Sequence, residues 1–224
     1  MKRIILTLGL AIYCLMVSAQ YKVDKLDGKS YMAGACIVEN ADDEVLFANL
    51  VLWAQQMADV PGMGMFSVLD YAKRHLELKT LVKGKSASYT GMLKMDVYGG
   101  IIKFRIDDLV QETVIIMSPK LTPFEKLQPE KKPAHKAAIE EFEQQESELI
   151  SSMLDFAKSN QLPKITHWQD IEKGRVVEGM TELECRLALG KPRIVIDDEK
   201  EVQWQINSSM YIFFRNGKVH SIVK

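Results

Sequence analysis

The stretch GMTELECRLALGKP, from Gly179 to Pro192, contains a short helix with a marked beginning and a marked end. Thr181 and Glu184 form a T-x-x-E capping box, in which each side chain can satisfy a backbone N–H of the first turn. Gly190 predicts a left-handed residue after the last turn, and Pro192 prevents the helix from continuing. A helix this short is marginal alone. Its firm caps therefore indicate that it is held in place to cover a sheet.

The residues that follow predict this sheet. Short runs of alternating apolar and polar residues are typical of strands with one buried face. These runs are 193–196, 202–206, 210–214 and 219–224. Asn216-Gly217 separates the last two runs and is a strong hairpin signal. A first helix over 166–172, with Trp168 and Ile171 facing inward, precedes the quoted stretch. Residues 164–224 therefore predict a small α+β domain.

Residues 20–160 predict a second α+β domain. Ser30 to Val38 is expected to form a buried strand, and Asn40 is predicted to be the N-cap of the next helix. That helix has one apolar face, and Pro61-Gly62 ends it. The face comprises Leu46, Leu50, Trp53 and Met57. Several antiparallel strands follow, and two alternating runs around Gly99-Gly100 predict a hairpin.

Four prolines between Ser118 and Pro133 predict a loop, and a long helix follows over 134–159. This helix carries an apolar stripe, interrupted by Glu146, that is expected to pack across the sheet. Its other acidic residues are expected to form a solvated face. They are Glu140, Glu141, Glu143 and Glu148. The predicted fold class is α+β, with two small domains, each an antiparallel sheet packed by helices.

The C-terminal part resembles the small outer-membrane assembly-factor family typified by BamE/SmpA. The resemblance rests on a series of residues at matching separations, and it covers about a quarter of the chain. They are Trp168, Ile171, Gly174, Gly179-Met180-Thr181, Leu189-Gly190-Lys191-Pro192, Trp204, Phe214 and Gly217-Lys218-Val219. The resemblance implies two helices against a three-stranded antiparallel sheet, in an envelope protein that works by contact with other proteins.

Residues 29–160 resemble a domain family of secreted bacterial proteins with a TBP-like fold. The resemblance rests on the helix end LVLW, residues 50–53, and on the hairpin KMDVYGGIIKFR, residues 94–105. It implies a fold and an exported location, and no activity. The net charge of −1, with no strongly basic half, argues against nucleic acid as a partner, since phosphate binding needs clustered Lys and Arg.

The N-terminus has the pattern of a secretory signal peptide. Lys2 and Arg3 precede an apolar run over 4–17, and small residues then offer a cleavage site after Ala19. The run is too short for a membrane-spanning helix, which needs about 20 residues. Bulky residues precede Cys14, so the lipobox of a lipoprotein is absent. We therefore expect an exported, periplasmic or envelope-associated protein without a permanent membrane span.

No motif in the sequence predicts a catalytic residue, a metal site or a cofactor. The histidines at 75, 135, 167 and 220 form no H-x-x-x-H pair, and the chain has no C-x-x-C and no G-x-S-x-G. Cys36 and Cys185 remain in the mature chain. An oxidising compartment permits a bridge between them, but their apolar surroundings favour free thiols.

The loop PGMGMFS, residues 61–67, offers the single candidate for a partner contact. Its glycines do not follow a strand, so a phosphate-binding loop is disfavoured. A flexible connection is the simpler interpretation. The sharper hypothesis is that Met63, Met65 and Phe66 form an adaptable apolar surface, because methionine suits varied partners.

The sequence thus predicts a non-enzymatic, exported protein that binds another envelope protein, a peptide or a glycan through direct contacts. Two alternatives stay open. The chain could be a hydrolase with a site in the cleft between its domains, in which several residues with shifted pKa values would converge. It could also be an enzyme inhibitor that uses its sheets to block an active site.

Overall fold

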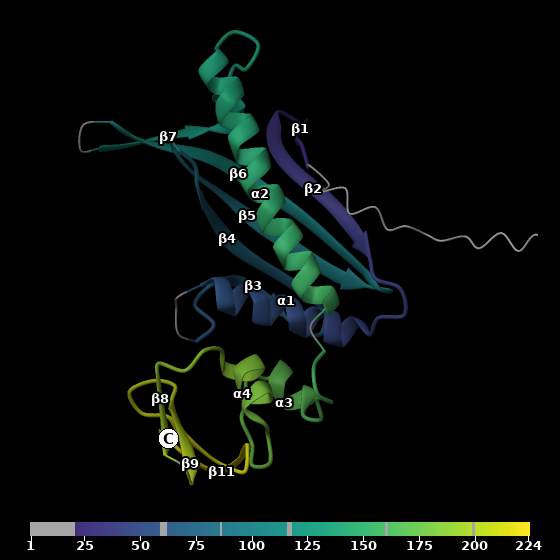
Figure 1. Ribbon diagram of the computed structural model, residues 1–224, viewed down its shortest axis with the longest axis vertical. Coiled ribbons are helices and arrows are strands. Elements are labelled where there is room, and N and C mark those ends of the chain that lie inside the picture. The colour runs from purple at the N-terminus through teal and green to yellow at the C-terminus, as the bar shows by residue number, and fades with distance from the viewer. Residues whose placement is uncertain (1–20, 59–61, 86, 116–117, 160, 199) are drawn as a thin grey trace, which may run out of the picture.

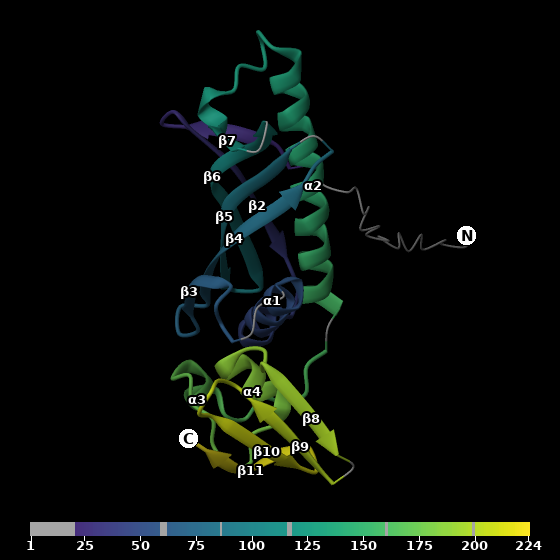
Figure 2. The same ribbon diagram turned by 90° about the vertical axis from the view of Figure 1, so that its left-hand side faces the viewer.

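The computed structural model describes residues 21–224 apart from 59–61, 86, 116–117, 160 and 199, and it contains two antiparallel sheets. The expected signal peptide lies outside the described residues. Figures 1 and 2 show the larger sheet with the long helix α2 along one face, and the smaller sheet with two short helices beyond it. The chain is therefore α+β, as the sequence predicts.

The larger sheet has seven strands in the order β1-β2-β6-β5-β4-β3, with β7 added on β6. Two helices and a 3-10 turn accompany it. The elements are β1 (Val23–Leu26), β2 (Lys29–Ile37), α1 (Asp43–Met57), β3 (Phe66–Asp70), β4 (His75–Lys83), β5 (Ser88–Tyr98), β6 (Ile101–Ile115), β7 (Ser118–Pro123), η1 (Phe124–Lys126) and α2 (Pro133–Ser159). The predicted hairpin at Gly99-Gly100 is confirmed as the turn between β5 and β6.

The smaller sheet has four strands in the order β11-β10-β9-β8. Its elements are α3 (Trp168–Glu172), α4 (Glu182–Leu189), β8 (Ile194–Asp198), β9 (Glu201–Gln205), β10 (Tyr211–Arg215) and β11 (Lys218–Val223). The strand runs predicted from the sequence are confirmed within a few residues. The three-stranded sheet implied by the family resemblance is wrong, because β8 adds a fourth strand beside β9.

Helix α1 differs from the prediction at its start and in its burial. Asp42, and not Asn40, is the N-cap, since its carboxylate accepts hydrogen bonds from the N–H groups of Glu44 and Val45, while Asn40 adopts a positive φ in the preceding turn. All ten residues over 46–55 are buried. The expected single apolar face is wrong because α1 contacts β5, α2 and α4 on different sides (Figure 1).

Part of the predicted loop over 118–133 is instead strand β7. It pairs with the second half of β6, where Val110 lies opposite Pro123 and Val114 opposite Pro119. Both prolines are tolerated because an edge strand leaves one side of its backbone without a sheet partner. The long β6 hairpin thus extends the sheet beyond the region that β2 covers.

The expected solvated acidic face of α2 is wrong for two of its four carboxylates, Glu141 and Glu143, and Glu146 in the apolar stripe is buried. Glu143 accepts hydrogen bonds from the N–H of Val23 and from Lys22, each at 2.8 Å. Glu141 accepts a hydrogen bond from the Tyr89 hydroxyl at 2.6 Å. The fully buried Glu146 accepts a hydrogen bond from Thr80 at 2.9 Å. Residues of the β1, β4 and β5 region surround α2 on more than one side, so these positions meet protein instead of water.

Candidate interaction surface

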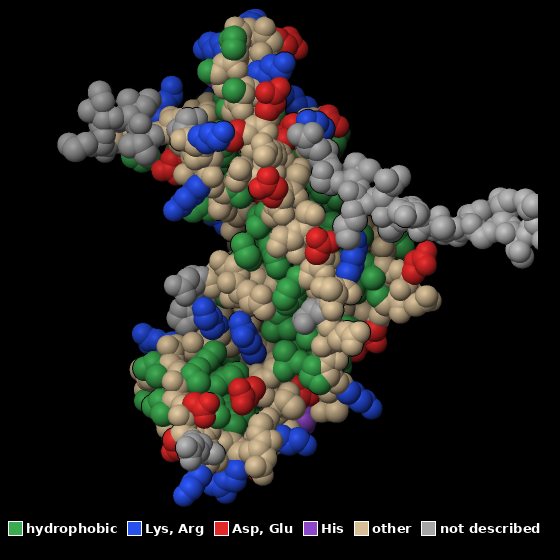
Figure 3. Space-filling model, viewed as in Figure 1, with side chains coloured by type: hydrophobic (Ala, Val, Ile, Leu, Met, Phe, Trp, Pro, Cys, Tyr) green, Lys and Arg blue, Asp and Glu red, His purple; other side chains and the backbone are tan. Residues whose placement is uncertain are grey.

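Strand β8 is the outermost strand of the smaller sheet and is exposed along its whole length. It pairs with β9 on one side, where Val195 lies opposite Trp204. Ile194, Val195 and Ile196 are 51%, 54% and 54% exposed. Figure 3 shows hydrophobic side chains gathered over this part of the molecule. Three adjacent exposed β-branched residues on a free sheet edge form an unusual surface, because natural proteins protect such edges.

The short helices explain why this edge is uncovered. Burial decreases from β10, where Ile212 and Phe214 are fully buried, through β9 to β8, where every residue is exposed. Helix α4 is eight residues long, and α3 has five. These helices lie over the middle of the sheet, and β8 extends beyond their cover (Figure 2).

The opposite edge of the same sheet is protected. Its strand, β11, begins with Lys218 and carries His220, which contacts Glu201. Of its apolar residues, Val219 is buried. Charged side chains on an edge strand discourage the addition of another strand. The two edges therefore differ, and β8 is the one suited to pairing.

Charged residues flank the apolar centre of β8. Arg193 precedes the strand, and Asp197 and Asp198 end it; all three are exposed. Within the described part of the chain, neither Arg193 nor Asp197 makes an ion pair. The backbone N–H of Arg193 donates to the carbonyl of Gln205 at 2.8 Å, so this residue is already held alongside β9. The edge thus presents a basic end, an apolar centre and an acidic end.

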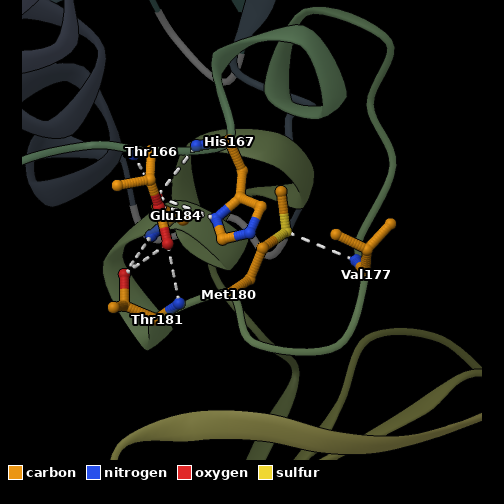
Figure 4. A network of polar contacts seen from close by, with 6 residues as sticks. All are labelled: Thr166, His167, Val177, Met180, Thr181 and Glu184. Atoms are coloured by element: carbon orange, nitrogen blue, oxygen red, sulfur yellow. Dashed lines mark hydrogen bonds and ion pairs between the residues drawn. The ribbon is translucent and has the colours of Figure 1, made fainter.

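The start of α4 is fixed by the buried carboxylate of Glu184 (Figure 4). It accepts hydrogen bonds from the backbone N–H groups of Thr181 at 2.8 Å, Thr166 at 2.6 Å and His167 at 3.1 Å. Burial by itself would raise the pKa of Glu184, but these hydrogen bonds outweigh it and hold the pKa at about 2. The predicted capping box is confirmed. Its carboxylate therefore has a structural role, because it holds the segment at 166–167 against the start of α4.

The end of α4 contacts the larger part of the molecule. Gln55 donates to the carbonyl of Arg186 at 3.1 Å and accepts from the guanidinium of the same residue at 3.0 Å. The Tyr71 hydroxyl donates to the carbonyl of Leu187, and its burial raises its pKa far above the usual value. The carbonyl of Arg186 also accepts the N–H of Gly190 at 2.8 Å, and Tyr71 supplies a donor for a second carbonyl in the last turn of the helix. The quoted stretch therefore joins the two sheets.

Gly190 also differs from the prediction in detail. Its φ is +81°, as expected for glycine, but its ψ of −164° lies outside the left-handed helical region. This backbone conformation is accessible to glycine alone. It lets the chain approach Gly62, whose N–H donates to the carbonyl of Lys191 at 2.7 Å.

The candidate residues of the 61–67 loop lie beside this junction. Met63, Met65 and Phe66 are partly buried, and Phe66 packs against the core. The sulfur of Met63 accepts a hydrogen bond from Gln55 at 3.6 Å. Their role as a partner surface stays a prediction. Sequence patterns contained no signal for Gln55 and Tyr71 as junction residues, because their partners lie 131 and 116 positions away.

A second open surface lies on the larger sheet, as a hollow of about 510 Å³. Its lining is Ala33, Gly34, Ala35, His75, Lys94, Asp96, Lys103, Phe104 and Arg105. The charges there largely satisfy one another. His75 contacts Asp96 at 2.8 Å and Glu77 at 3.2 Å, and Arg105 contacts Asp107 at 2.6 Å. Burial would lower the pKa of His75, but its two carboxylate partners raise it. Because these charges are already paired, this face is a weaker candidate for a binding surface than the exposed apolar edge of β8.

Other features bear on the predicted chemistry. Cys36 and Cys185 are both free thiols, as the apolar surroundings favoured, and burial raises the pKa of Cys185 to about 12. Among the described residues, no three His, Cys, Asp or Glu side chains gather closely enough to hold a metal ion. No helix in that part of the chain has the length and apolar character to cross a membrane.

Comparison with solved structures supports the fold of the larger part. A TBP-like protein from Parabacteroides distasonis ATCC 8503 matches 62% of this chain and 98% of its own, with a TM-score of 0.51 and 12% identity. A DUF4468 family protein from Bacteroides ovatus ATCC 8483 matches 64% of this chain and 94% of its own, with a TM-score of 0.43 and 10% identity. The first of these matches confirms the predicted TBP-like fold.

No protein-family model and no curated protein matches the chain. The resemblance of the C-terminal part to the BamE/SmpA family accordingly stays a prediction. At 12% identity the TBP-like structure defines an architecture alone, which is an antiparallel sheet with helices, and this chain adds to it a separate four-stranded sheet.

Proposed function

We propose that this protein is a non-enzymatic binding protein that pairs the free edge of β8 with an extended segment of a protein partner. The observation that carries the proposal is the run Ile194, Val195 and Ile196, each more than half exposed on a strand that, among the described residues, pairs with β9 alone. An added strand satisfies the free backbone groups of such an edge, and alternate side chains supply specificity. The exported location expected from the sequence makes an envelope protein or peptide the natural partner.

The alternative of a hydrolase with a site between the domains requires a cleft lined by several titratable groups. The described junction contains a hollow of about 40 Å³, next to Tyr71 and Trp168. The Tyr71 hydroxyl there already donates to the carbonyl of Leu187. Because this hollow is small and its hydroxyl group is engaged, we favour binding at β8 over catalysis at the junction. An inhibitor would be a binding protein whose partner is an enzyme.

Site-specific photo-crosslinking in the producing cells tests this proposal. A photo-reactive phenylalanine derivative at position 196 should form covalent adducts with a protein, whereas the same group at the exposed Leu81 of the larger sheet should not. The matched variant carries Val195→Lys in addition. Because position 195 is exposed, the fold should persist, and the lysine should abolish the adducts by protecting the edge. Adducts that form at position 81 alone, or that ignore the lysine, would refute binding at β8.

A further inference from the structure

We propose that the strand that pairs with β8 is β8 of a second copy of this chain, in an antiparallel arrangement centred on Val195. This inference rests on the proposed function, since it names the occupant of the same edge. It would join two four-stranded sheets into one continuous sheet across the dimer axis. The order of residues along the edge and the faces on which they lie favour this arrangement.

The edge is complementary to itself. Arg193, Ile194, Val195, Ile196 and Asp197 read base, apolar, apolar, apolar, acid. When two such strands run in opposite directions about Val195, Arg193 of each copy lies opposite Asp197 of the other. Ile194 then lies opposite Ile196, and Val195 opposite itself. Opposite charges and β-branched pairs directly across antiparallel strands are favourable, so this one register satisfies all five positions.

Other two-fold registers are disfavoured. Under a two-fold axis perpendicular to the sheet, one residue of β8 must lie opposite its own copy. Directly opposed side chains have to lie on the same face, so a residue cannot pair with its sequence neighbour. Centring on Ile196 would place Asp197 against Val195 and Asp198 against Ile194, which would desolvate carboxylates without partners. Centring on Ile194 would place Arg193 against Val195 and leave Asp197 beyond the pairing.

The faces of the smaller sheet fit the same arrangement. Val195 lies opposite Trp204 and so shares the helix-covered face with it, while Ile194 and Ile196 lie opposite Gln205 and Gln203 on the open face. In the dimer the two valines would meet beside the helices, and the isoleucines would form a continuous apolar strip on the open face. The exposed apolar area of Ile194, Val195 and Ile196 would thereby be covered.

The ion pairs that the dimer requires are available. Arg193 and Asp197 are exposed, and in the described part of the chain no ion pair engages either of them. They lie at alternate positions with Val195 and so project from the same face of the strand. Each dimer would contain the pair twice because of its symmetry.

Charge reversal tests the register, with sedimentation equilibrium of the exported, processed protein as the measurement. The wild type should be a dimer. Arg193→Asp and Asp197→Arg should each weaken dimerisation at least tenfold, because each places like charges opposite one another. The double variant R193D/D197R should restore it. All of these positions are exposed, so circular dichroism should show an unchanged fold. A dimer that resists both single reversals, or a double variant that stays monomeric, would refute the register.

A disulfide trap provides an independent measurement. Val195→Cys in a Cys36→Ser background should oxidise to a covalent dimer, since position 195 meets itself across the axis. The control is Val223→Cys on the opposite edge strand β11, which is similarly exposed at 50% and should stay monomeric. A wild type that is monomeric at high micromolar concentration overturns the second copy as occupant. If the photo-crosslinks at position 196 then identify a different protein, the proposed function stands; if they are absent, both fail.

Discussion

Gly190 and Gly62 meet backbone to backbone at the junction of the two sheets. A Cβ atom built on Gly190 would overlap the carbonyl group of Gly62, and the N–H of Gly62 donates to the carbonyl of Lys191 at 2.7 Å. Gly190, which the sequence predicts as the end of the helix, thus has a second structural role. It ends α4, and it also brings the C-terminal part against the TBP-like part.

Replacing Gly190 by alanine should destabilise the protein more than the same change at Gly217. Both residues have positive φ, at +81° and +70°, but a Cβ at Gly217 meets no atom within 4 Å. The backbone strain is about 1–3 kcal/mol in either case, and Gly190→Ala adds the overlap with Gly62. Denaturant melts of both variants measure the difference. Equal losses of unfolding free energy would show that the contact between the glycines is unimportant.

Replacing Glu184 by glutamine should lower stability near neutral pH by about 1–3 kcal/mol, through loss of charge-assisted hydrogen bonds. The folded pKa of about 2 lies below the ordinary value of 4.5. The carboxylate therefore stabilises the fold above about pH 4.5, and this contribution is lost as the pH falls towards 2. The difference in unfolding free energy between Glu184→Gln and the wild type should therefore become smaller in acid. Glu182→Gln, on the same helix turn, serves as the control, and a gap independent of pH would contradict the prediction.

Replacing Glu146 by glutamine should have the opposite pH dependence. Burial raises the pKa of Glu146 to about 7, and the hydrogen bond from Thr80 offsets this in part. The raised pKa favours the protonated carboxyl in the fold, so wild-type stability should fall as the pH rises from about 4.5 to about 7 and stay lower above that.

Between about pH 5 and pH 8, the unfolding free energy of the glutamine variant should therefore rise relative to that of the wild type, by on the order of 1–3 kcal/mol. Any cost of the unpaired amide is the same at both pH values and cancels in this comparison. Chemical denaturation at the two pH values gives the result. A constant difference between Glu146→Gln and wild type would show that the carboxyl does not titrate in this range.

Limited proteolysis should cleave the chain near residues 160–164, between α2 and the C-terminal part, because exposed connections are preferred sites. The two fragments should stay together after cleavage, since Gln55, Tyr71 and Gly62 hold the end of α4. Size-exclusion chromatography of the digest reports this association. Cleavage restricted to 118–132 would place the domain boundary before α2.

Mass spectrometry of the exported protein should find Gln20, or its cyclised form, at the N-terminus. The reason is the order of basic, apolar and small residues over 1–19. A protein that retains Met1, or that begins with a lipidated Cys14, would contradict the predicted processing.

Local features of the fold were predictable from the sequence because neighbouring residues create them. Thr181 and Glu184 lie three residues apart and cap one helix turn, and Gly99-Gly100 and Gly217 form their turns from adjacent backbone atoms. The strand runs of the smaller sheet were legible for the same reason. The run at 193–196 predicted β8 as a strand, but alternation alone does not tell whether a strand lies at an edge.

The sequence by itself therefore determined the α+β class, the capped helix α4, the hairpins and the long helix α2. Tertiary structure alone decided which strands lie at the edges, that α1 is buried on every side, and that Glu141 and Glu143 bond to protein groups instead of facing water. It also decided that Gln55 and Tyr71 form hydrogen bonds with the last turn of α4. The physical reason is range: a cap or a turn is stabilised by neighbouring residues, whereas burial and edge exposure depend on how separate elements pack after folding. Gln55 and Tyr71, for example, bond to residues 131 and 116 positions away.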